Sequence, residues 1–312
     1  MYNAEKTIKK TIASITGQIY KNIEIIIVDN CSTDASVKIV QMCDDPRIRL
    51  IRNDTHFPSA ELNWNRCFAF AKGEYMAIFH ADDIYLPDMI SRQVETFRSF
   101  PTVGAVFTMG NIINENGAVI GQFRLPPEIK GGEPYAYQEI FNSALEYADF
   151  LPTPSAMLRR DIYLKFSPFR YDQFGSASDF DMWLRVTAYT PIIILDEKLM
   201  QYRVSKMQGT NILNRLRTQG SDFFKVMDFH IARNKDTVKI SEKAMNSYDL
   251  SRFGDQLICA RNSLYKKNGT EFKDQISNIP WIKYLKIVIQ NPRLLYKKFQ
   301  LYSYFRIFKV QG

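Results

Sequence analysis

The chain has 312 residues, 46% of them hydrophobic, so it can bury a full core and is globular rather than disordered. Its net charge of +8 is unevenly spread, because residues 281–312 carry seven lysines and arginines and no acidic residue, whereas the preceding part is nearly neutral. A neutral body without any nucleic-acid-binding motif excludes nucleic acid as an expected partner.

The cysteines and the first residues indicate an intracellular protein. The four cysteines have neither the spacing of metal ligands nor the density of a disulfide framework, which favours free thiols in a reducing compartment. They are Cys31, Cys43, Cys67 and Cys259. Lysines near the N-terminus are not followed by the long apolar stretch of a leader peptide, so we expect the chain to stay in the cytoplasm.

Helix and strand patterns alternate through the first 110 residues. Helices are expected over residues 4–18, 32–42, 60–71 and 87–99, and strands over residues 23–28, 48–51, 75–79 and 103–108. Such alternation is typical of an α/β protein with a mainly parallel sheet flanked by helices. The chain begins directly with a helix, however, so the strand at 23–28 would lack its central neighbour. Either the true start lies upstream or the sheet has lost a strand.

The second half of the chain is less regular. Turn signals between residues 110 and 150 indicate a hairpin, and a strand is expected to run through Met157. A helix over 180–190 and two strands, over 192–195 and 199–202, follow. Beyond them polar helical patterns dominate, so we predict an α/β domain over residues 1–210 and a helical region over 211–312.

Carboxylates stand where several predicted elements meet. Asp29 and the adjacent pair Asp82 and Asp83 each follow an apolar strand, and Asp179 and Asp181 open a helix. In an open α/β sheet such strand ends gather at one edge, where ligands bind. Two neighbouring carboxylates repel each other unless a cation lies between them, which predicts a site for Mg²⁺ or Mn²⁺. The alternative is an Asp-Asp turn with a helix cap.

Several short motifs follow one another along the chain. In chain order they are Tyr-Asn-Ala-Glu at 2–5, Ile-Val-Asp-Asn-Cys-Ser-Thr-Asp at 27–34, Asn65, Ala-Lys-Gly-Glu-Tyr at 71–75, His-Ala-Asp-Asp at 80–83, Ser-Asp-Phe-Asp-Met-Trp-Leu-Arg at 178–185 and Tyr-Arg at 202–203. Taken in this order, they resemble the motifs of the family 2 glycosyltransferases, which are inverting enzymes with the GT-A (Rossmann-like) fold. The likeness covers residues 1–210. It implies transfer of a sugar from a nucleotide-sugar, a UDP-sugar in particular, to a glycan or lipid-linked acceptor in surface polysaccharide biosynthesis.

The resemblance also implies roles for individual residues. Asp82 would bind the metal ion, Asp179 would be the catalytic base, and Asp181 and Trp183 would lie on the acceptor side. The expected donor-binding residues are Tyr2, Asn3, Asp29, Ser32, Asn65, His80 and Asp83. For Asp29 the alternative is a structural role in the turn.

Three features depart from the family pattern. His80 stands where relatives usually have aspartate, Ser205 stands where they commonly have histidine near the diphosphate, and the first strand is missing. These departures favour an alternative, a catalytically impaired GT-A-like subunit that binds a nucleotide or a partner enzyme. The retained Asp82 and Asp179 argue against it.

The C-terminal segment 281–312 mixes basic and aromatic residues. This composition predicts a segment that lies on an anionic membrane surface, and its charges are too frequent for a spanning helix. The alternative is a pair of terminal helices that pack on the protein body and expose a basic face.

Overall fold

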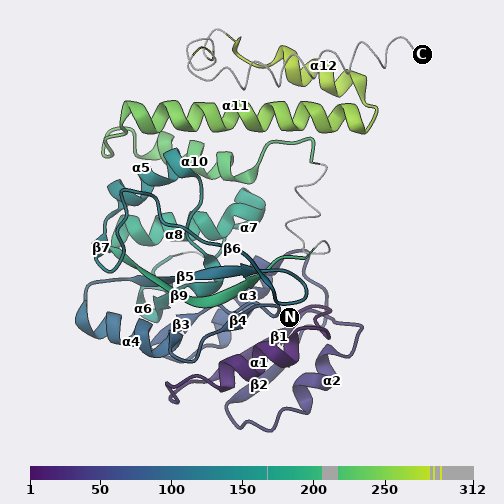
Figure 1. The fold of residues 1–312 in the computed structure, drawn as a ribbon, viewed down its shortest axis with the longest axis vertical. Coiled ribbons are helices and arrows are strands. Elements are labelled where there is room, and N and C mark those ends of the chain that lie inside the picture. The colour runs from purple at the N-terminus through teal and green to yellow at the C-terminus, as the bar shows by residue number, and fades with distance from the viewer. Residues whose placement is uncertain (167, 206–216, 282–283, 285–288, 290–312) are drawn as a thin grey trace. The chain divides into compact units, whose positions relative to one another are not determined.

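The computed structural model describes residues 1–166, 168–205, 217–281, 284 and 289. These residues form two compact units (Figure 1). The first comprises residues 1–141 and 149–205, and the second comprises residues 142–148 together with the described residues from 217 onward. Each unit has its own hydrophobic clusters, and the predicted site residues all belong to the first.

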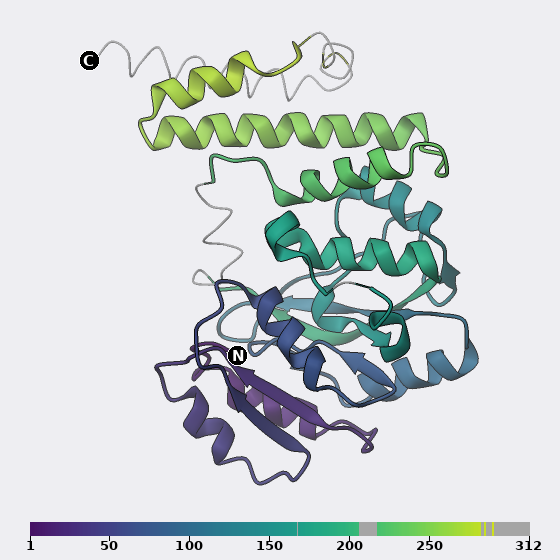
Figure 2. The same cartoon turned by 180° about the vertical axis from the view of Figure 1, so that it is seen from behind.

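The first unit begins with a small parallel sheet. Its strands β1 (Ile25–Asp29) and β2 (Ile48–Arg52) pair in register from Ile25 with Ile48 to Asp29 with Arg52, and they run side by side in Figure 2. The main chain of Met1 lies against β1 as well, since its nitrogen donates to the oxygen of Val28 and its oxygen accepts from the nitrogen of Asn30. Among the described strands, β2 is the one strand neighbour of β1.

Three helices accompany this small sheet. They are α1 (Ile8–Thr16), α2 (Ser36–Gln41) and α3 (Ala60–Phe70). Helix α1 forms because its isoleucines recur at helical spacing and bury one face. Ile8 and Ile12 pack with Val40 of α2 in a common apolar cluster, and the side chain of Ser59 caps α3 by accepting from the nitrogen of Leu62. Packing of the apolar faces of α1 and α2 joins these two helices to the loop between β3 and β4, which carries the site described below.

The second sheet forms the centre of the first unit. Its strands are β3 (Tyr75–Ala77), β4 (Ile84–Tyr85), β5 (Ala105–Ile113), β6 (Val119–Gln122), β7 (Pro134–Tyr135), β8 (Met157–Arg159) and β9 (Ile192–Arg203). The order is β3-β8-β5-β9-β4, with β6 beside β5 and β7 beside β9. Strands β5 and β9 are parallel, whereas the other pairs in this sheet are antiparallel.

Helices cover both faces of this sheet. Val106 of β5 packs in a cluster with α4 (Met89–Ser99), whereas the next residue, Phe107, packs edge-on against Trp183 of α8 (Ser178–Tyr189). Because neighbouring side chains of a strand point to opposite faces, α4 and α8 lie on opposite sides of β5, as Figure 1 shows. Short helices complete the unit. They are η1 (Thr153–Ser155), α6 (Arg160–Tyr163), α7 (Tyr171–Phe174) and η2 (Gly175–Ala177).

The α/β architecture predicted from the sequence is confirmed, with three differences in detail. The sheet is mixed, because β8, β6, β7 and β4 join it antiparallel. The two strands expected over 192–195 and 199–202 form one continuous strand, β9. Helix α5 (Tyr137–Tyr147) occupies part of the region where the sequence indicated a hairpin, and that hairpin is confined to β5 and β6.

The second unit is helical. It contains α10 (Asp222–Arg233), α11 (Glu242–Tyr265) and α12 (Gly269–Ser277). Phe253 and Leu257 of α11 pack with Phe272 of α12 in a core that also buries Tyr284 and packs against Trp281. These two aromatic residues of the predicted membrane segment therefore pack against their own unit. Most of the segment 281–312 lies outside the described residues.

In the part of the chain that the structure describes, every helix is too short or too polar to cross a membrane.

Candidate active site

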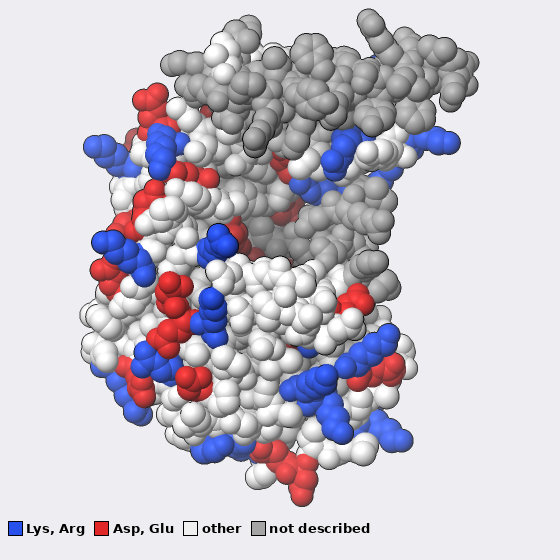
Figure 3. Space-filling view, in the orientation of Figure 1, with Lys and Arg blue, Asp and Glu red and all other residues white. Residues whose placement is uncertain are grey.

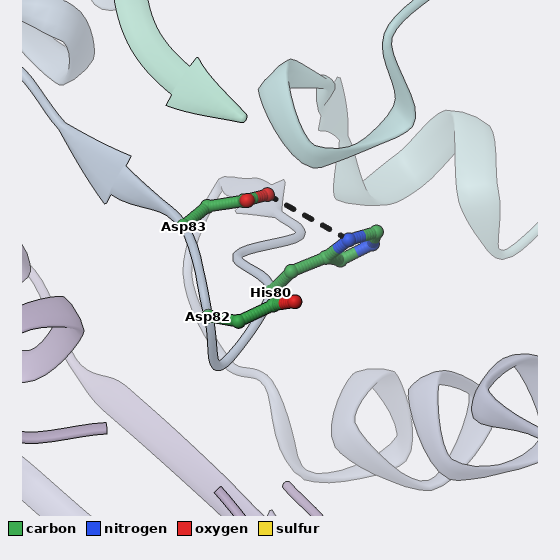
Figure 4. Close-up of side chains that lie close together, drawn as sticks. All are labelled: His80, Asp82 and Asp83. Atoms are coloured by element: carbon green, nitrogen blue, oxygen red, sulfur yellow. Dashed lines mark ion pairs between the residues drawn. The ribbon is translucent and has the colours of Figure 1, made fainter. Parts of the chain in front are cut away.

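The central feature of the site is the loop between β3 and β4, which carries His80, Asp82 and Asp83. One ligand atom from each of these side chains lies within 4.8 Å of the others. The three side chains extend to the same side of the loop, and Nδ1 of His80 is 3.8 Å from Oδ2 of Asp83 (Figure 4). The sequence placed these residues at a strand end, and the structure brings their side chains together.

Two neighbouring elements hold the loop in place. Thr11 of α1 donates its hydroxyl to the carbonyl oxygens of Ala81, at 3.1 Å, and of Asp83, at 2.8 Å. Arg203, at the end of β9, donates its backbone N–H to Oδ1 of Asp83 at 2.8 Å and its side-chain Nε to the carbonyl of Asp82 at 2.9 Å. The sequence marked Arg203 only as part of the Tyr-Arg motif and did not mark Thr11, because both residues act on the loop over a long sequence separation.

Burial dominates the electrostatics of the loop, although the charge of Arg203 acts against it by lowering the pKa of Asp82 and of Asp83. Burial raises the pKa of Asp82, and burial together with the charge of Asp82 raises the pKa of Asp83 well above its ordinary value. Burial also lowers the pKa of His80 to about 4, so its imidazole is neutral at pH 7. Within the described part of the chain, the buried atoms Asp83 Oδ2 and His80 Nε2 have no hydrogen-bond partner.

This donor set fits a divalent cation. An unpartnered buried polar atom costs about 1–3 kcal/mol, and a cation between Nδ1 of His80 and Oδ2 of Asp83 would compensate the unpartnered carboxylate oxygen. Ligand atoms bound to one ion at about 2.1 Å are at most about 4.2 Å apart, so small side-chain rotations would bring all three groups onto one ion. Carboxylate oxygens suit Mg²⁺ and Mn²⁺, and a neutral imidazole suits Mn²⁺ and later transition metals.

A second group of predicted residues lies at the end of β1. Asp29 is fully buried, and one of its carboxylate oxygens accepts from the backbone N–H of Ser32 at 3.2 Å. The hydroxyl of Ser32 in turn accepts from the backbone N–H of Asn3 at 3.0 Å. The exposed ring of Tyr2 packs against His56 with ring centroids 4.6 Å apart. The structure thus links Tyr2, Asn3, Asp29 and Ser32, and their contact with a donor stays a prediction.

Asn65 makes a different kind of contact from the one expected. Its side-chain amide donates to the carbonyl of Phe169 at 3.1 Å and accepts from the nitrogen of the same residue at 2.8 Å. Phe169 packs edge-on against Trp64, whose ring stacks on His80 at 5.2 Å. Asn65 therefore positions the aromatic residues beside the metal-ligand candidates, and its direct contact with a donor stays a prediction.

The predicted base, Asp179, lies in the first turn of α8. One of its oxygens accepts from the hydroxyl of Thr153 at 2.9 Å, and the other accepts from the N–H of Phe180 at 2.7 Å. The same hydroxyl accepts from the indole nitrogen of Trp183 at 2.9 Å, so the fully buried tryptophan orients Thr153 toward Asp179. Burial raises the pKa of Asp179, which makes it a stronger base than an exposed aspartate.

A further carboxylate, Asp149, interacts with the predicted base. Asp149 is an exposed residue, yet the surrounding protein and the negative charge of Asp179 raise its pKa well above the ordinary value. One oxygen of Asp149 accepts from the backbone N–H of Leu151 at 3.0 Å. No sequence motif marks Asp149, and only folding brings it within electrostatic range of Asp179.

Asp181 has a structural environment. It is fully buried and accepts hydrogen bonds from Arg170 and, at 2.9 Å, from Nε of Arg185 one turn later on α8. Its carboxylate therefore compensates two guanidinium groups and ties α8 to the segment that precedes α7. A position of Asp181 on the acceptor side stays a prediction. Its contacts indicate that it would act there by holding α8 and the segment before α7 in place.

We expect Asp181→Ala to lower the free energy of unfolding by about 3–5 kcal/mol, because it leaves two partly buried arginines without their carboxylate. Urea denaturation followed by circular dichroism measures this change. Asp172→Ala, an exposed carboxylate of α7, is the matched control and should change the stability by less than about 0.5 kcal/mol. Equal unfolding midpoints for the two variants would contradict the structural role of Asp181.

The fold and the site together define an α/β protein with a carboxylate-rich loop at the edge of its sheet. The family model for glycosyl transferase family 2 matches residues 1–166, more than half of the chain. The chain belongs to glycosyl transferase family 2.

Individual relatives agree with this assignment. An uncharacterized glycosyltransferase of Methanocaldococcus jannaschii is 29% identical over 69% of this chain and 71% of its own length. The Escherichia coli enzyme WfaP, a UDP-Glc:α-D-GlcNAc-diphosphoundecaprenol β-1,3-glucosyltransferase, is 37% identical over 45% of this chain. The chain spans only about half of WfaP, with 54% of that protein matched.

Solved structures show the same fold. Residues 1–349 of Staphylococcus aureus TarS, in complex with UDP-GlcNAc, match 88% of this chain and 87% of that one, with a TM-score of 0.54 and 14% identity. The mannosyltransferase PcManGT from Pyrobaculum calidifontis, in complex with GDP-Man and Mn²⁺, matches 97% of this chain and 82% of that one, with a TM-score of 0.54 and 16% identity. The predicted GT-A fold is thereby confirmed.

Proposed function

We propose that this chain transfers one sugar from a UDP-sugar to a glycan or lipid-linked acceptor, with inversion at the anomeric carbon and with the help of a divalent metal ion. The observation that carries this proposal is the cluster of His80, Asp82 and Asp83, in which the buried oxygen Oδ2 of Asp83 has no hydrogen-bond partner among the described residues. Family membership narrows the chemistry to glycosyl transfer.

The residues of the site fit a single displacement. The acceptor hydroxyl oxygen forms a bond to the anomeric carbon while the bond from that carbon to the donor phosphate breaks, and Asp179 takes the hydroxyl proton. Attack from the side opposite the leaving group inverts the configuration. Asp82 and Asp83 would hold a divalent cation, which would supply charge neutralisation to the departing diphosphate. Thr153 keeps the Asp179 carboxylate oriented through its 2.9 Å hydrogen bond.

Two relatives support the choice of donor and acceptor. WfaP and a second Escherichia coli enzyme, WfgD, are both described as UDP-Glc-dependent glucosyltransferases that act on a sugar linked to diphosphoundecaprenol. WfgD is 30% identical over 41% of this chain. A lipid-linked acceptor of the same class would require this chain to work at a membrane surface.

The experiment that tests this function is a donor screen. The purified chain is titrated calorimetrically with UDP, UDP-glucose, UDP-GlcNAc and GDP-mannose in the presence of Mn²⁺, and nucleotide release is then measured with a synthetic diphosphate-linked sugar acceptor. We expect binding of uridine nucleotides and release of UDP only when donor and acceptor are both present. Binding of no nucleotide would overturn the proposal.

The alternative function is a subunit that binds a nucleotide or an enzyme partner without catalysis. His80 and Ser205, at positions where the family pattern has other residues, are the observations in its favour. The donor screen separates the two functions, because a non-catalytic subunit would bind a nucleotide and release no UDP in the presence of acceptor.

We also propose that residues 281–312 hold the chain at an anionic membrane. Removal of residues 290–312 deletes five cations and leaves the packed Trp281 and Tyr284 in place. At about 1 kcal/mol for each cation near the surface, the loss should weaken sedimentation with phosphatidylserine vesicles at least tenfold at low salt.

The control for this experiment is a basic surface elsewhere on the chain. Figure 3 shows basic side chains gathered over α1 and α2, where Lys6, Lys9, Lys10 and Lys38 are exposed. Substitution of alanine for Lys6, Lys9 and Lys10 should leave vesicle binding nearly unchanged. If these substitutions weaken binding and the truncation does not, the membrane contact lies on α1 and the proposal for the terminal segment is wrong.

A further inference from the structure

The imidazole of His80 is placed to do more than support the site loop. We propose that His80 is a direct ligand of the divalent cation, so that the site combines one nitrogen with the carboxylates of Asp82 and Asp83 and prefers Mn²⁺ or Co²⁺ to Mg²⁺. This inference rests on the proposed metal-dependent transfer and specifies its metal site.

The geometry of the facing side chains carries the inference. Nδ1 of His80 is 3.8 Å from Oδ2 of Asp83, which is too long for a hydrogen bond and suitable for two ligands of one ion. Among the described residues, that carboxylate oxygen has no hydrogen-bond donor, although Asp83 is fully buried. A histidine with a purely structural role would be expected to donate a hydrogen bond to it.

The imidazole ring is also held in the orientation that ligation needs. Trp64 stacks on it with ring centroids 5.2 Å apart and an angle of 16° between the planes, and Phe169 supports Trp64 from its edge. The backbone N–H of His80 donates to the hydroxyl of Tyr85 at 2.7 Å. Ring and backbone are therefore both positioned before any ion binds, which lowers the entropy lost on binding.

The nitrogen ligand determines which metals the site prefers. Mg²⁺ binds oxygen ligands and gains most from negative charge, whereas imidazole suits the transition metals. A neutral imidazole in place of a third carboxylate removes one negative charge from the cluster. The site formed by His80, Asp82 and Asp83 should therefore bind Mn²⁺ and Co²⁺ at least tenfold more tightly than Mg²⁺, a difference of about 1.4 kcal/mol or more.

Pulsed electron paramagnetic resonance of bound Mn²⁺ tests direct ligation without relying on activity. The full chain is loaded with Mn²⁺ alone and with Mn²⁺ plus UDP, and the echo modulation from a coordinated nitrogen is recorded. We expect a ¹⁴N modulation that changes when the histidines are labelled with ¹⁵N. It should disappear in His80→Gln and persist in His56→Gln, since His56 is the matched exposed histidine.

Metal titrations complete the test. The His80→Asp variant should bind Mg²⁺ more tightly than the unsubstituted chain does, because it has a third carboxylate. The ratio of its Mn²⁺ affinity to its Mg²⁺ affinity should be about tenfold smaller.

Absence of nitrogen modulation in the unsubstituted chain, both with and without UDP, would overturn the inference. If transfer proceeds without any metal, the result supports the proposed function and contradicts the proposed metal site. If Mn²⁺ shows nitrogen coupling and no nucleotide binds, the result supports the metal site and contradicts the proposed function.

Discussion

Asp179→Asn should lower kcat for sugar transfer by about 10²–10⁴-fold, because an amide cannot accept the proton of the attacking hydroxyl. Asparagine keeps the size of the side chain and an oxygen for the hydroxyl of Thr153, which lies 2.9 Å from the present carboxylate. The affinity for the donor should change little, since the acidic loop at Asp82 and Asp83 is untouched. Steady-state rates of UDP release, together with calorimetric affinities, separate these two effects.

The pH dependence gives a second measurement on the same residue. Burial raises the pKa of Asp179, and only the deprotonated form can act as the base. The value of kcat/KM should therefore fall as the pH is lowered through this raised pKa. The midpoint of that fall should lie at a higher pH than the ordinary aspartate pKa of about 3.9.

The matched control for Asp179 is Asp172→Asn, an exposed carboxylate of α7 that should retain full activity. Unchanged kcat in Asp179→Asn would show that another group takes the proton. Equal losses in the two variants would show that the assay reports on the stability of this region instead of on catalysis.

Asp82→Ala should abolish the metal-dependent part of UDP binding. The substitution removes one of the two carboxylates that would hold the cation against the diphosphate, and Asp83 would remain as the buried one. We expect UDP in the presence of Mn²⁺ to bind about a hundredfold more weakly, a loss of about 2.7 kcal/mol. Calorimetric titration with and without Mn²⁺ isolates the metal-dependent term.

Asp44→Ala, an exposed carboxylate in the loop between α2 and β2, controls for a general loss of negative charge. It should bind UDP and Mn²⁺ as the unsubstituted chain does. If Asp82→Ala retains metal-dependent binding, Asp82 is not the ligand that the sequence predicted, and the metal ion is held without it.

Local patterns were sufficient to predict most elements of this fold. The helical spacing of Ile8, Ile12 and Ile15 and the β-branched run that becomes β1 identify their elements because each pattern depends on neighbours in the sequence. The Asp82–Asp83 pair could likewise be located at a strand end. Ordered motifs then identified the family, which the family model confirms.

The sequence by itself determined the α/β class, the family and the residue types of the acidic loop. The tertiary structure decided the antiparallel additions to the sheet, the contact of Arg203 with Asp83 and the approach of Asp149 to Asp179. The stacking of Trp64 on His80 also appears only in three dimensions. The physical reason is that strand pairing and side-chain contacts join residues far apart in the chain, and their free energy depends on burial and charge that exist only after folding.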